Sequence, residues 1–309
     1  MADSTPRRKA RCPIVRRVTV ITASCLRLVV TFHFRPNAHI LSDMRNKILT
    51  SALALMTLGS AATAADLSNI IQAELRPGWR KADGTHMTAL QLTLAPGWKT
   101  YWRAPGDAGI PPSFDWSGSS NMESVGITWP TPKVMYQSGM RSVGYSDQVV
   151  FPIQITPSAD GDINLNARVD LGLCKDICLP HSVTIRATLT ADTTKPDPVI
   201  AAALSDRPFS EKEAGVGKVT CDIAPSSDGV TLTARIPMAD SGGKEETVIE
   251  TSNPMIWVSE PDVTRQGKEL ITAADLSHVE GKPFALDRSG IRITVLGKSY
   301  AVDIKGCDG

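Results

Sequence analysis

The sequence predicts an all-β protein made of two tandem immunoglobulin-like β-sandwich domains that follow a signal peptide. Two observations favour this class. Apolar residues recur at every second position in many short segments, and turn residues separate those segments at nearly regular intervals. Helical periodicity is confined to one short stretch, 196–206. Many short strands without alternating helices are typical of sandwiches rather than of β-α-β units.

The first predicted sandwich covers residues 65–192 and the second covers 218–309, with a linker rich in proline and charge at 193–217. Both have the usual size of a domain and can bury a core. The strands predicted in the first are 87–94, 149–155, 163–173 and 183–189. Those predicted in the second are 219–223, 230–236, 247–250, 255–260, 291–296 and 300–304.

A secretory signal peptide is predicted at 44–64. It has a basic head from Met44 to Lys47, an apolar run of about a dozen residues, and the small residues Ala62 and Ala64 around the expected cleavage point. Residues 1–43 have two interpretations, an additional targeting or anchoring region, or sequence upstream of a true start at Met44. We favour a start at Met44, because a complete signal peptide at an internal methionine is otherwise hard to explain.

Charge excludes some classes of function. The whole chain has 33 basic and 32 acidic residues, but ten basic and only two acidic residues fall before residue 65, which leaves the remainder with a net charge near −7. An acidic exported protein without basic clusters is a poor candidate for binding nucleic acid.

No stretch after Ala64 has the length and apolarity of a membrane span, so we expect a soluble periplasmic protein. Hydrolase and phosphate-binding motifs are absent from the sequence.

Four cysteines follow the predicted signal peptide: Cys174, Cys178, Cys221 and Cys307. An even number in an oxidising compartment suggests two disulfides, and three pairings are possible. The economical pairing joins neighbours, 174 with 178 and 221 with 307. The second bridge would close a loop of about 86 residues and stabilise the fold by on the order of 4 kcal/mol, as a structural disulfide. The first closes a very short loop, which makes it a candidate for redox chemistry, although a simple loop staple is the alternative.

Four motifs around this pair resemble the N-terminal periplasmic domain of the DsbD/ScsB thiol reductases. The matching stretches are GWKTYWRAPGDAGIPP at 97–112, ITWPTP at 127–132, GYSDQVVFP at 144–152 and LCKDICLP at 173–180. The family continues into a membrane domain and a thioredoxin domain, and the sequence predicts a stand-alone form without them.

The resemblance implies a thiol:disulfide oxidoreductase that works through Cys174 and Cys178 and needs no cofactor. Cys178 would form the mixed disulfide, and Cys174 would resolve it. A membrane-embedded thiol reductase of DsbD or CcdA type would donate electrons. The clients would be thioredoxin-like or isomerase proteins of the periplasm, in cytochrome c biogenesis or copper tolerance. A mobile loop shields the cysteines in this family, and the matching stretch is about 133–144, with Met135 or Tyr136 as cap.

Other interpretations of the same residues stay open. A non-catalytic binding module with structural disulfides is one alternative. A copper-handling protein is another, with Cys174, Cys178 and His181 as soft-metal ligands, although three ligands are few. The aromatic residues Trp98, Tyr101, Trp102, Trp116 and Trp129 are predicted to pack in the core rather than to line a groove. His86 and His278 are isolated and are predicted to lie at the surface.

Overall fold

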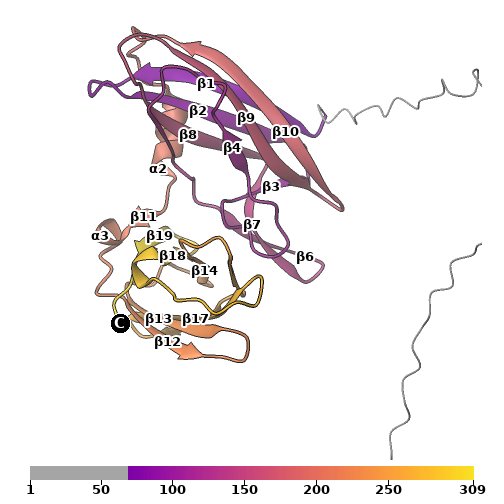
Figure 1. The fold of residues 1–309 in the computed structure, drawn as a ribbon, viewed down its shortest axis with the longest axis vertical. Helices are drawn as coiled ribbons and strands as arrows, with labels where there is room; N and C mark the ends of the chain where they lie inside the picture. Colours follow the sequence, from indigo (N-terminus) through magenta and orange to yellow (C-terminus); the bar gives the residue numbers. More distant parts are fainter. Residues whose placement is uncertain (1–68) are drawn as a thin grey trace, which may run out of the picture. The chain divides into compact units, whose positions relative to one another are not determined.

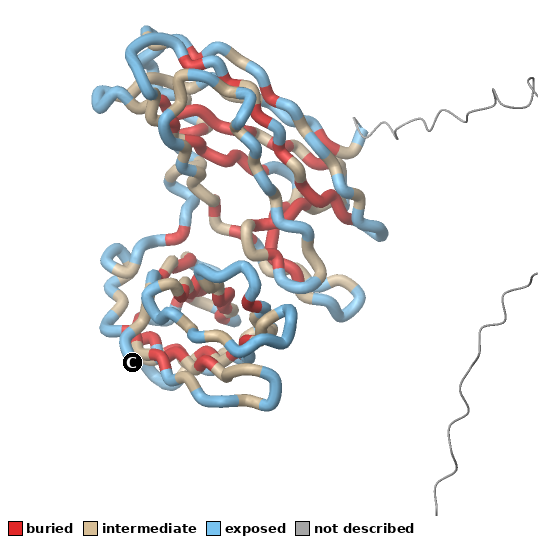
Figure 2. Tube along the Cα trace, viewed as in Figure 1, coloured by how far each residue is buried: buried red, intermediate tan, exposed pale blue. Residues whose placement is uncertain are grey.

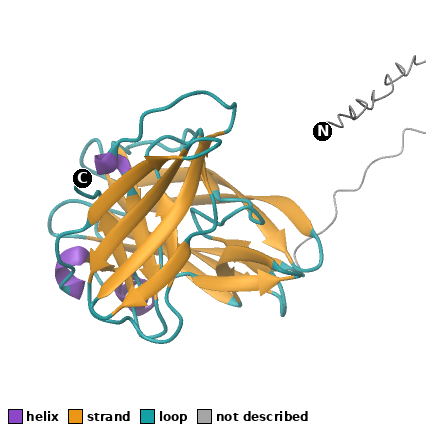
Figure 3. Cartoon of the chain, turned by 90° about the horizontal axis from the view of Figure 1, so that it is seen from below, coloured by secondary structure: helices purple, strands orange, loops and turns teal. Residues whose placement is uncertain are grey.

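β-Strands dominate the fold, and its helices are few and short (Figures 1 and 3). The structure is a computed structural model that describes residues 69–309. The predicted signal peptide at 44–64 and the segment 1–43 lie outside the described residues. Residues 69–309 all belong to a single compact unit. No helix among them combines the length and the apolarity that crossing a bilayer requires.

The first sandwich consists of two antiparallel sheets. One has the strand order β1-β2-β8-β5, and the other has the order β10-β9-β3-β7-β6, with β4 paired to β9. The bounds are β1 Ile71–Arg80, β2 His86–Leu94, β3 Lys99–Tyr101, β4 Ser113–Asp115, β5 Ser124–Ile127, β6 Lys133–Gln137, β7 Met140–Ser146, β8 Gln148–Thr156, β9 Ile163–Cys174 and β10 Cys178–Leu189. Alternating apolar residues of β2, β8 and β9 meet between the sheets as the core (Figure 2).

One helix covers the outer face of the first sheet. Helix α2, Pro198–Ser205, packs its buried Ile200 against residues of β2 and β8 that point away from the main core. Both faces of β2 are therefore covered, which explains why its buried residues run almost continuously along the strand. Asp197 begins the helix, because its carboxylate accepts hydrogen bonds from the backbone of Val199 and Ile200, and it also pairs with Arg76 at 2.9 Å.

The second sandwich has the sheet orders β11-β19-β18-β14 and β12-β13-β17-β15, with β16 paired to β17. The bounds are β11 Phe209–Ser210, β12 Thr220–Pro225, β13 Val230–Pro237, β14 Glu246–Glu250, β15 Ile256–Val258, β16 Asp262–Gln266, β17 Glu269–His278, β18 Arg292–Leu296 and β19 Ala301–Lys305, with α3 at Glu211–Ala214 and a 3-10 turn, η1, at Arg288–Gly290. The segment 193–217, predicted to be a linker, contains α2, β11 and α3, and β11 pairs in parallel with β19.

The longest strand of the second sandwich, β17, is absent from the sequence prediction. It is central, because it pairs with β13, β15 and β16. Its inward residues include the small or polar Thr272 and Ala274 beside Leu270 and Leu276, and Thr272 hydrogen bonds with Thr247 at 2.7 Å. Small inward residues weaken the apolar alternation on which strand prediction depends.

The prediction for His86 is wrong, because its side chain is buried, with 1% exposed. Its Nε2 lies 2.7 Å from the carbonyl oxygen of Pro77, and burial lowers the pKa of the imidazole. The unfolded chain therefore takes up a proton at a higher pH than the folded protein does, at about pH 6.5. The stability contributed by the neutral ring is fully present above that pH and is lost as the pH falls.

We expect the midpoint of urea unfolding to decrease as the pH is lowered from about 7 to 5, which spans the ordinary histidine pKa. The variant His86→Gln should show a smaller decrease over the same range, since its side chain does not titrate. Urea titrations of both proteins at several pH values give the comparison. Equal pH dependence in the two proteins would contradict this assignment.

Candidate functional site

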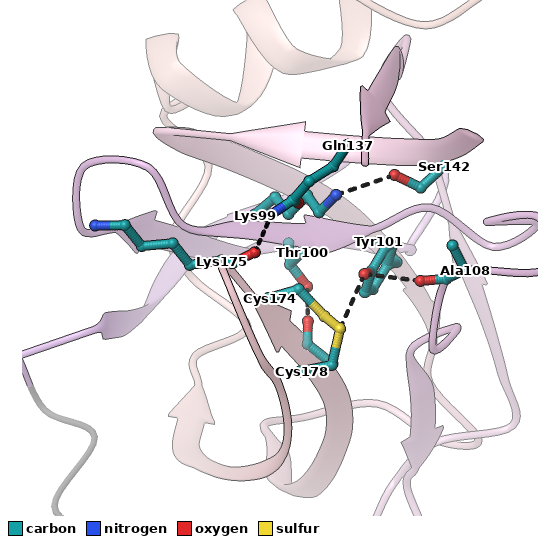
Figure 4. Close-up of a disulfide and its surroundings, with 10 residues drawn as sticks. Lys99, Thr100, Tyr101, Ala108, Gln137, Ser142, Cys174, Lys175 and Cys178 are labelled. Atoms are coloured by element: carbon teal, nitrogen blue, oxygen red, sulfur yellow. Dashed lines mark hydrogen bonds between the residues drawn. A yellow bond between two sulfur atoms is a disulfide. The ribbon is translucent and has the colours of Figure 1, made fainter. Parts of the chain in front are cut away.

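The two cysteines of the short-loop pair lie opposite each other at the end of a long hairpin. Strands β9 and β10 pair without a register shift from Ile163 and Leu189 to Cys174 and Cys178. The sulfur atoms of these cysteines are bonded, and their Cα atoms are 4.1 Å apart. Residues 175–177 form the turn between them and are exposed. The hairpin therefore carries the bridge at its tip (Figure 4).

The two sulfur-bearing residues differ in exposure. Cys174 is 1% exposed, whereas Cys178 belongs to the exposed residues. Along β9, Leu171 and Leu173 point into the core, so Gly172 and Cys174 point to the outer face of the sheet. An outward residue is buried only if something covers it. Other segments of the chain must therefore lie over this part of the outer face.

One cover is the segment 104–112, which connects β3 with β4. Both strands pair with β9, at Cys174 and at 168–170, so the connection lies over the stretch between those pairs. Gly172 makes this close approach possible. A Cβ atom there would lie 2.7 Å from the Cβ of Ile110 and 3.1 Å from the ring of Tyr101. A larger residue at 172 would push the segment away from the bridge.

Tyr101 contacts the bridge directly. Its hydroxyl donates a hydrogen bond to the carbonyl of Ala108 at 3.0 Å and lies 3.5 Å from the Sγ of Cys178 (Figure 4). The residue is 1% exposed, and burial raises the pKa of its phenol. The phenol therefore keeps its proton at neutral pH. The hydroxyl has one proton to donate, and by turning it from the Ala108 carbonyl to Cys178 it can stabilise a charged sulfur there.

Lys99 provides a positive charge on the same face. It is the register partner of Cys174 across β3 and β9, and paired residues point to the same side of a sheet. Its ammonium donates to the hydroxyl of Ser142 at 3.3 Å and lies 6.0 Å from the centre of the Tyr101 ring. Burial lowers the pKa of this ammonium. A cation on this face favours thiolate formation after the bridge opens.

The stretch predicted to cap the cysteines is a hairpin of β6 and β7. Its two-residue turn, Ser138 and Gly139, has positive φ at both positions, 53° and 81°. Gln137 is the residue that contacts the cysteine loop, because its amide donates to the carbonyl of Lys175. Met135 accepts a hydrogen bond from Ser142 through its carbonyl, and the exposed Tyr136 points to Glu246 and Glu260. A capping role for Met135 or Tyr136 stays a prediction.

The remaining predicted site residues lie apart from this centre or inside the core. His181 lies on β10 opposite Leu171, and residues 69–309 contain no cluster of three or more potential metal ligands. Cys221 and Cys307 are bonded to each other, with Cα atoms 5.7 Å apart, in the second sandwich. Four of the five aromatic residues pack in or against the core as predicted: Trp102 is fully buried, and Trp98, Trp116 and Trp129 pack against the core cluster. Tyr101 is the exception, because it is buried on the outer face of the sheet beside the bridge.

Comparison with known proteins agrees with this architecture. Residues 71–190 match the family described as thiol:disulfide interchange protein DsbD, N-terminal. The structure is similar to the crystal structure of the N-terminal periplasmic domain of ScsB from Proteus mirabilis, with a TM-score of 0.63 and 22% sequence identity. That similarity covers 80% of this chain and 96% of the other, and at this identity it shows a shared fold. No curated protein sequence matches this chain.

Proposed function

Since residues 71–190 belong to the family of DsbD N-terminal domains, we propose that this protein relays electrons by disulfide exchange at Cys174 and Cys178. A membrane-embedded thiol reductase of DsbD or CcdA type reduces the pair. The pair then reduces disulfide-bearing proteins of the periplasm, of the thioredoxin-like or isomerase kind. The protein acts in the periplasm, to which the signal peptide predicted at 44–64 directs it.

The difference in exposure between the two cysteines is the observation that supports this proposal. Disulfide exchange needs one sulfur that a partner can reach in line with the bridge, and a second sulfur that leaves. Cys178 is exposed at the tip of the hairpin, and Cys174 is buried beside it. A purely structural disulfide does not need one exposed and one buried cysteine, whereas an exchange site depends on this difference.

The exchange has two halves, reduction of the pair by the donor and reduction of the client by the pair, and the bonds formed and broken balance in each. A donor thiolate attacks the Sγ of Cys178, forms a mixed disulfide and expels the thiolate of Cys174, and the second donor thiol then releases the dithiol form. In the other half, the thiolate of Cys178 attacks a client disulfide and expels a client thiolate. The thiolate of Cys174 then attacks Cys178, which releases the second client thiolate and restores the bridge.

Tyr101 and Lys99 would support these steps. Each half of the exchange produces a negatively charged sulfur at Cys174 or Cys178. The Tyr101 hydroxyl, 3.5 Å from Cys178, and the Lys99 ammonium on the same face stabilise such a charge. Both groups are themselves partly or fully buried, which strengthens their interaction with a nearby thiolate.

A redox titration of the purified, oxidised protein tests the proposal. The protein is equilibrated with mixtures of reduced and oxidised glutathione, free thiols are alkylated, and mass mapping shows which cysteines have opened. We expect the Cys174–Cys178 bridge to open reversibly at a potential well above about −300 mV, below which structural disulfides typically lie. The Cys221–Cys307 bridge is the internal control and should stay closed.

The same titration can overturn the proposal. If both bridges resist reduction to the same potential, the Cys174–Cys178 bridge is a structural one. The protein would then be a β-sandwich binding module with two structural disulfides.

A further inference from the structure

Two segments flank the proposed exchange site, and both also contact the second sandwich. The first is the cover segment, residues 104–112, whose Ala108 accepts the hydrogen bond of the Tyr101 hydroxyl beside Cys178. The second is the β6–β7 hairpin, residues 133–146, whose Gln137 donates to the backbone of the cysteine loop. The positions of these segments decide which sulfur a partner can approach.

The second sandwich contacts the cover segment through one tryptophan. The indole nitrogen of Trp257 donates to the carboxylate of Asp107 at 2.6 Å. Trp257 lies on the short strand β15, which is held by pairing with β17, and its side chain is 42% exposed. The indole N–H thus has a directed contact with the first sandwich, at Asp107, the residue before Ala108.

The second sandwich contacts the β6–β7 hairpin through a carboxylate. Glu246, at the start of β14, accepts a hydrogen bond from the Tyr136 hydroxyl at 3.1 Å and pairs with Arg141 at 3.4 Å. Arg141 also donates to the carbonyl of Thr247 at 3.0 Å. The side chains of Arg141 and Glu246 are only 7% and 14% exposed, so water screens their attraction weakly.

Glu246 stays ionised in this environment. Burial alone would raise its pKa, but the hydrogen bond from Lys244 and the charge of Arg141 outweigh burial and lower it. Lys244 is exposed and lies 2.6 Å from Glu246, and its ammonium is also 5.5 Å from the Tyr136 ring. The Glu246 carboxylate is therefore paired with one cation from each sandwich, Arg141 from the first and Lys244 from the second.

We propose that the second sandwich braces both segments around the exchange site, with Trp257 and Glu246 as positioning residues that limit access to the cysteine pair. This inference rests on the proposed exchange function. With both contacts in place, the cover segment keeps Cys174 buried, and a thiol reaches the bridge only at Cys178. Without them, the hairpin keeps only its contacts with Glu260 and the carbonyl of Thr247. The segments then open more often, and a thiol can approach the bridge from more directions.

The brace acts on access and leaves the relative stability of the oxidised and reduced pair unchanged. Reduction of the bridge by dithiothreitol and its reoxidation by glutathione disulfide should therefore both accelerate when the brace is removed. We expect about a fivefold increase in each rate for the double variant Trp257→Phe with Glu246→Ala, from a shift in the population of open segments. The equilibrium with glutathione should stay as it is in the unaltered protein.

The matched control is Glu269→Ala in the same sandwich. Glu269 pairs with Arg235 at the surface, 3.3 Å away, and the exposed pair lies on β17 and β13. Asp107→Asn tests the cover segment separately, because an amide oxygen keeps the acceptor for the Trp257 indole, while Asp107→Ala removes it. We expect Asp107→Asn to react like the unaltered protein and Asp107→Ala to react faster.

Hydrogen exchange measured by mass spectrometry provides a second observable that does not depend on disulfide chemistry. In the double variant, amide exchange should increase in residues 104–112 and 133–146 and stay unchanged in the other paired strands of the first sandwich, β1, β2, β8, β9 and β10. This measurement also shows whether the variant is folded.

The outcomes separate the brace from the exchange function. If the double variant and the Glu269 control have the rates of the unaltered protein, the brace is overturned while the exchange function stands. If the rates change together with the glutathione equilibrium, the two residues set stability rather than access, and the inference is likewise wrong. If the unaltered bridge does not react at all, the exchange function fails, and unchanged hydrogen exchange in 104–112 and 133–146 would overturn the brace as well.

Discussion

Replacing Cys174 with serine will stop disulfide turnover and leave Cys178 joined to its partner in a stable mixed disulfide. The opposed register of the two cysteines makes the second sulfur an intramolecular nucleophile. Well-oriented intramolecular reactions reach effective concentrations of about 10⁵ M and above, so a free thiol in solution cannot replace it. We expect turnover with a thioredoxin-fold client to fall by roughly a thousandfold or more.

The measurement is non-reducing electrophoresis with mass mapping after incubation of the reduced variant with oxidised client. Cys178→Ser is the matched control and should trap almost no client, because the remaining Cys174 is 1% exposed. Equal trapping by both variants would mean that burial does not select the reacting sulfur, and the assigned roles of the two cysteines would be wrong.

Removing the other disulfide will affect stability instead of exchange. The Cys221–Cys307 bridge spans 86 residues and ties the start of β12 to the segment after β19. The loop-closure model assigns such a bridge about 4–5 kcal/mol, against about 2 kcal/mol for a loop as short as that between Cys174 and Cys178. We therefore expect Cys221→Ala with Cys307→Ala to lose roughly twice as much free energy of unfolding as Cys174→Ala with Cys178→Ala.

Urea unfolding of both double variants gives the two losses, and hydrogen exchange shows where each occurs. The 221/307 variant should exchange faster in β12 to β19, whereas β1 to β10 should keep their protection. Equal losses in the two variants would argue against a division of the disulfides into a structural and a reactive one.

The strands that hold the cysteines could be predicted well because their signal is local. Residues 163–173 and 183–189 alternate clearly, and in the structure these strands extend as far as Cys174 and Cys178 themselves. The short helix predicted at 196–206 is present as α2. Strand β17 escaped prediction because Thr272, Ala273 and Ala274 interrupt its apolar pattern.

The environment of the bridge could not be predicted from local pattern. Trp257 and Asp107 are 150 positions apart in the sequence, and Tyr136 and Glu246 are 110 apart. Nothing in the residues around Asp107 indicates a partner in the second sandwich. The burial of Cys174 likewise depends on the connection between β3 and β4, and alternation alone would place this residue on an open outer face.

The presence of a single exposed cysteine in the pair has a kinetic consequence for the proposed relay. Donor and client must both react at Cys178, so they occupy the same place in turn and cannot be bound together. Such a sequence gives ping-pong kinetics, in which each partner competes with the other for the protein. A large excess of oxidised client would then bind the protein while its cysteine pair is still oxidised. Such binding transfers no electrons and delays reduction of the pair by the donor. The rate of electron flow therefore has a maximum at an intermediate ratio of donor to client.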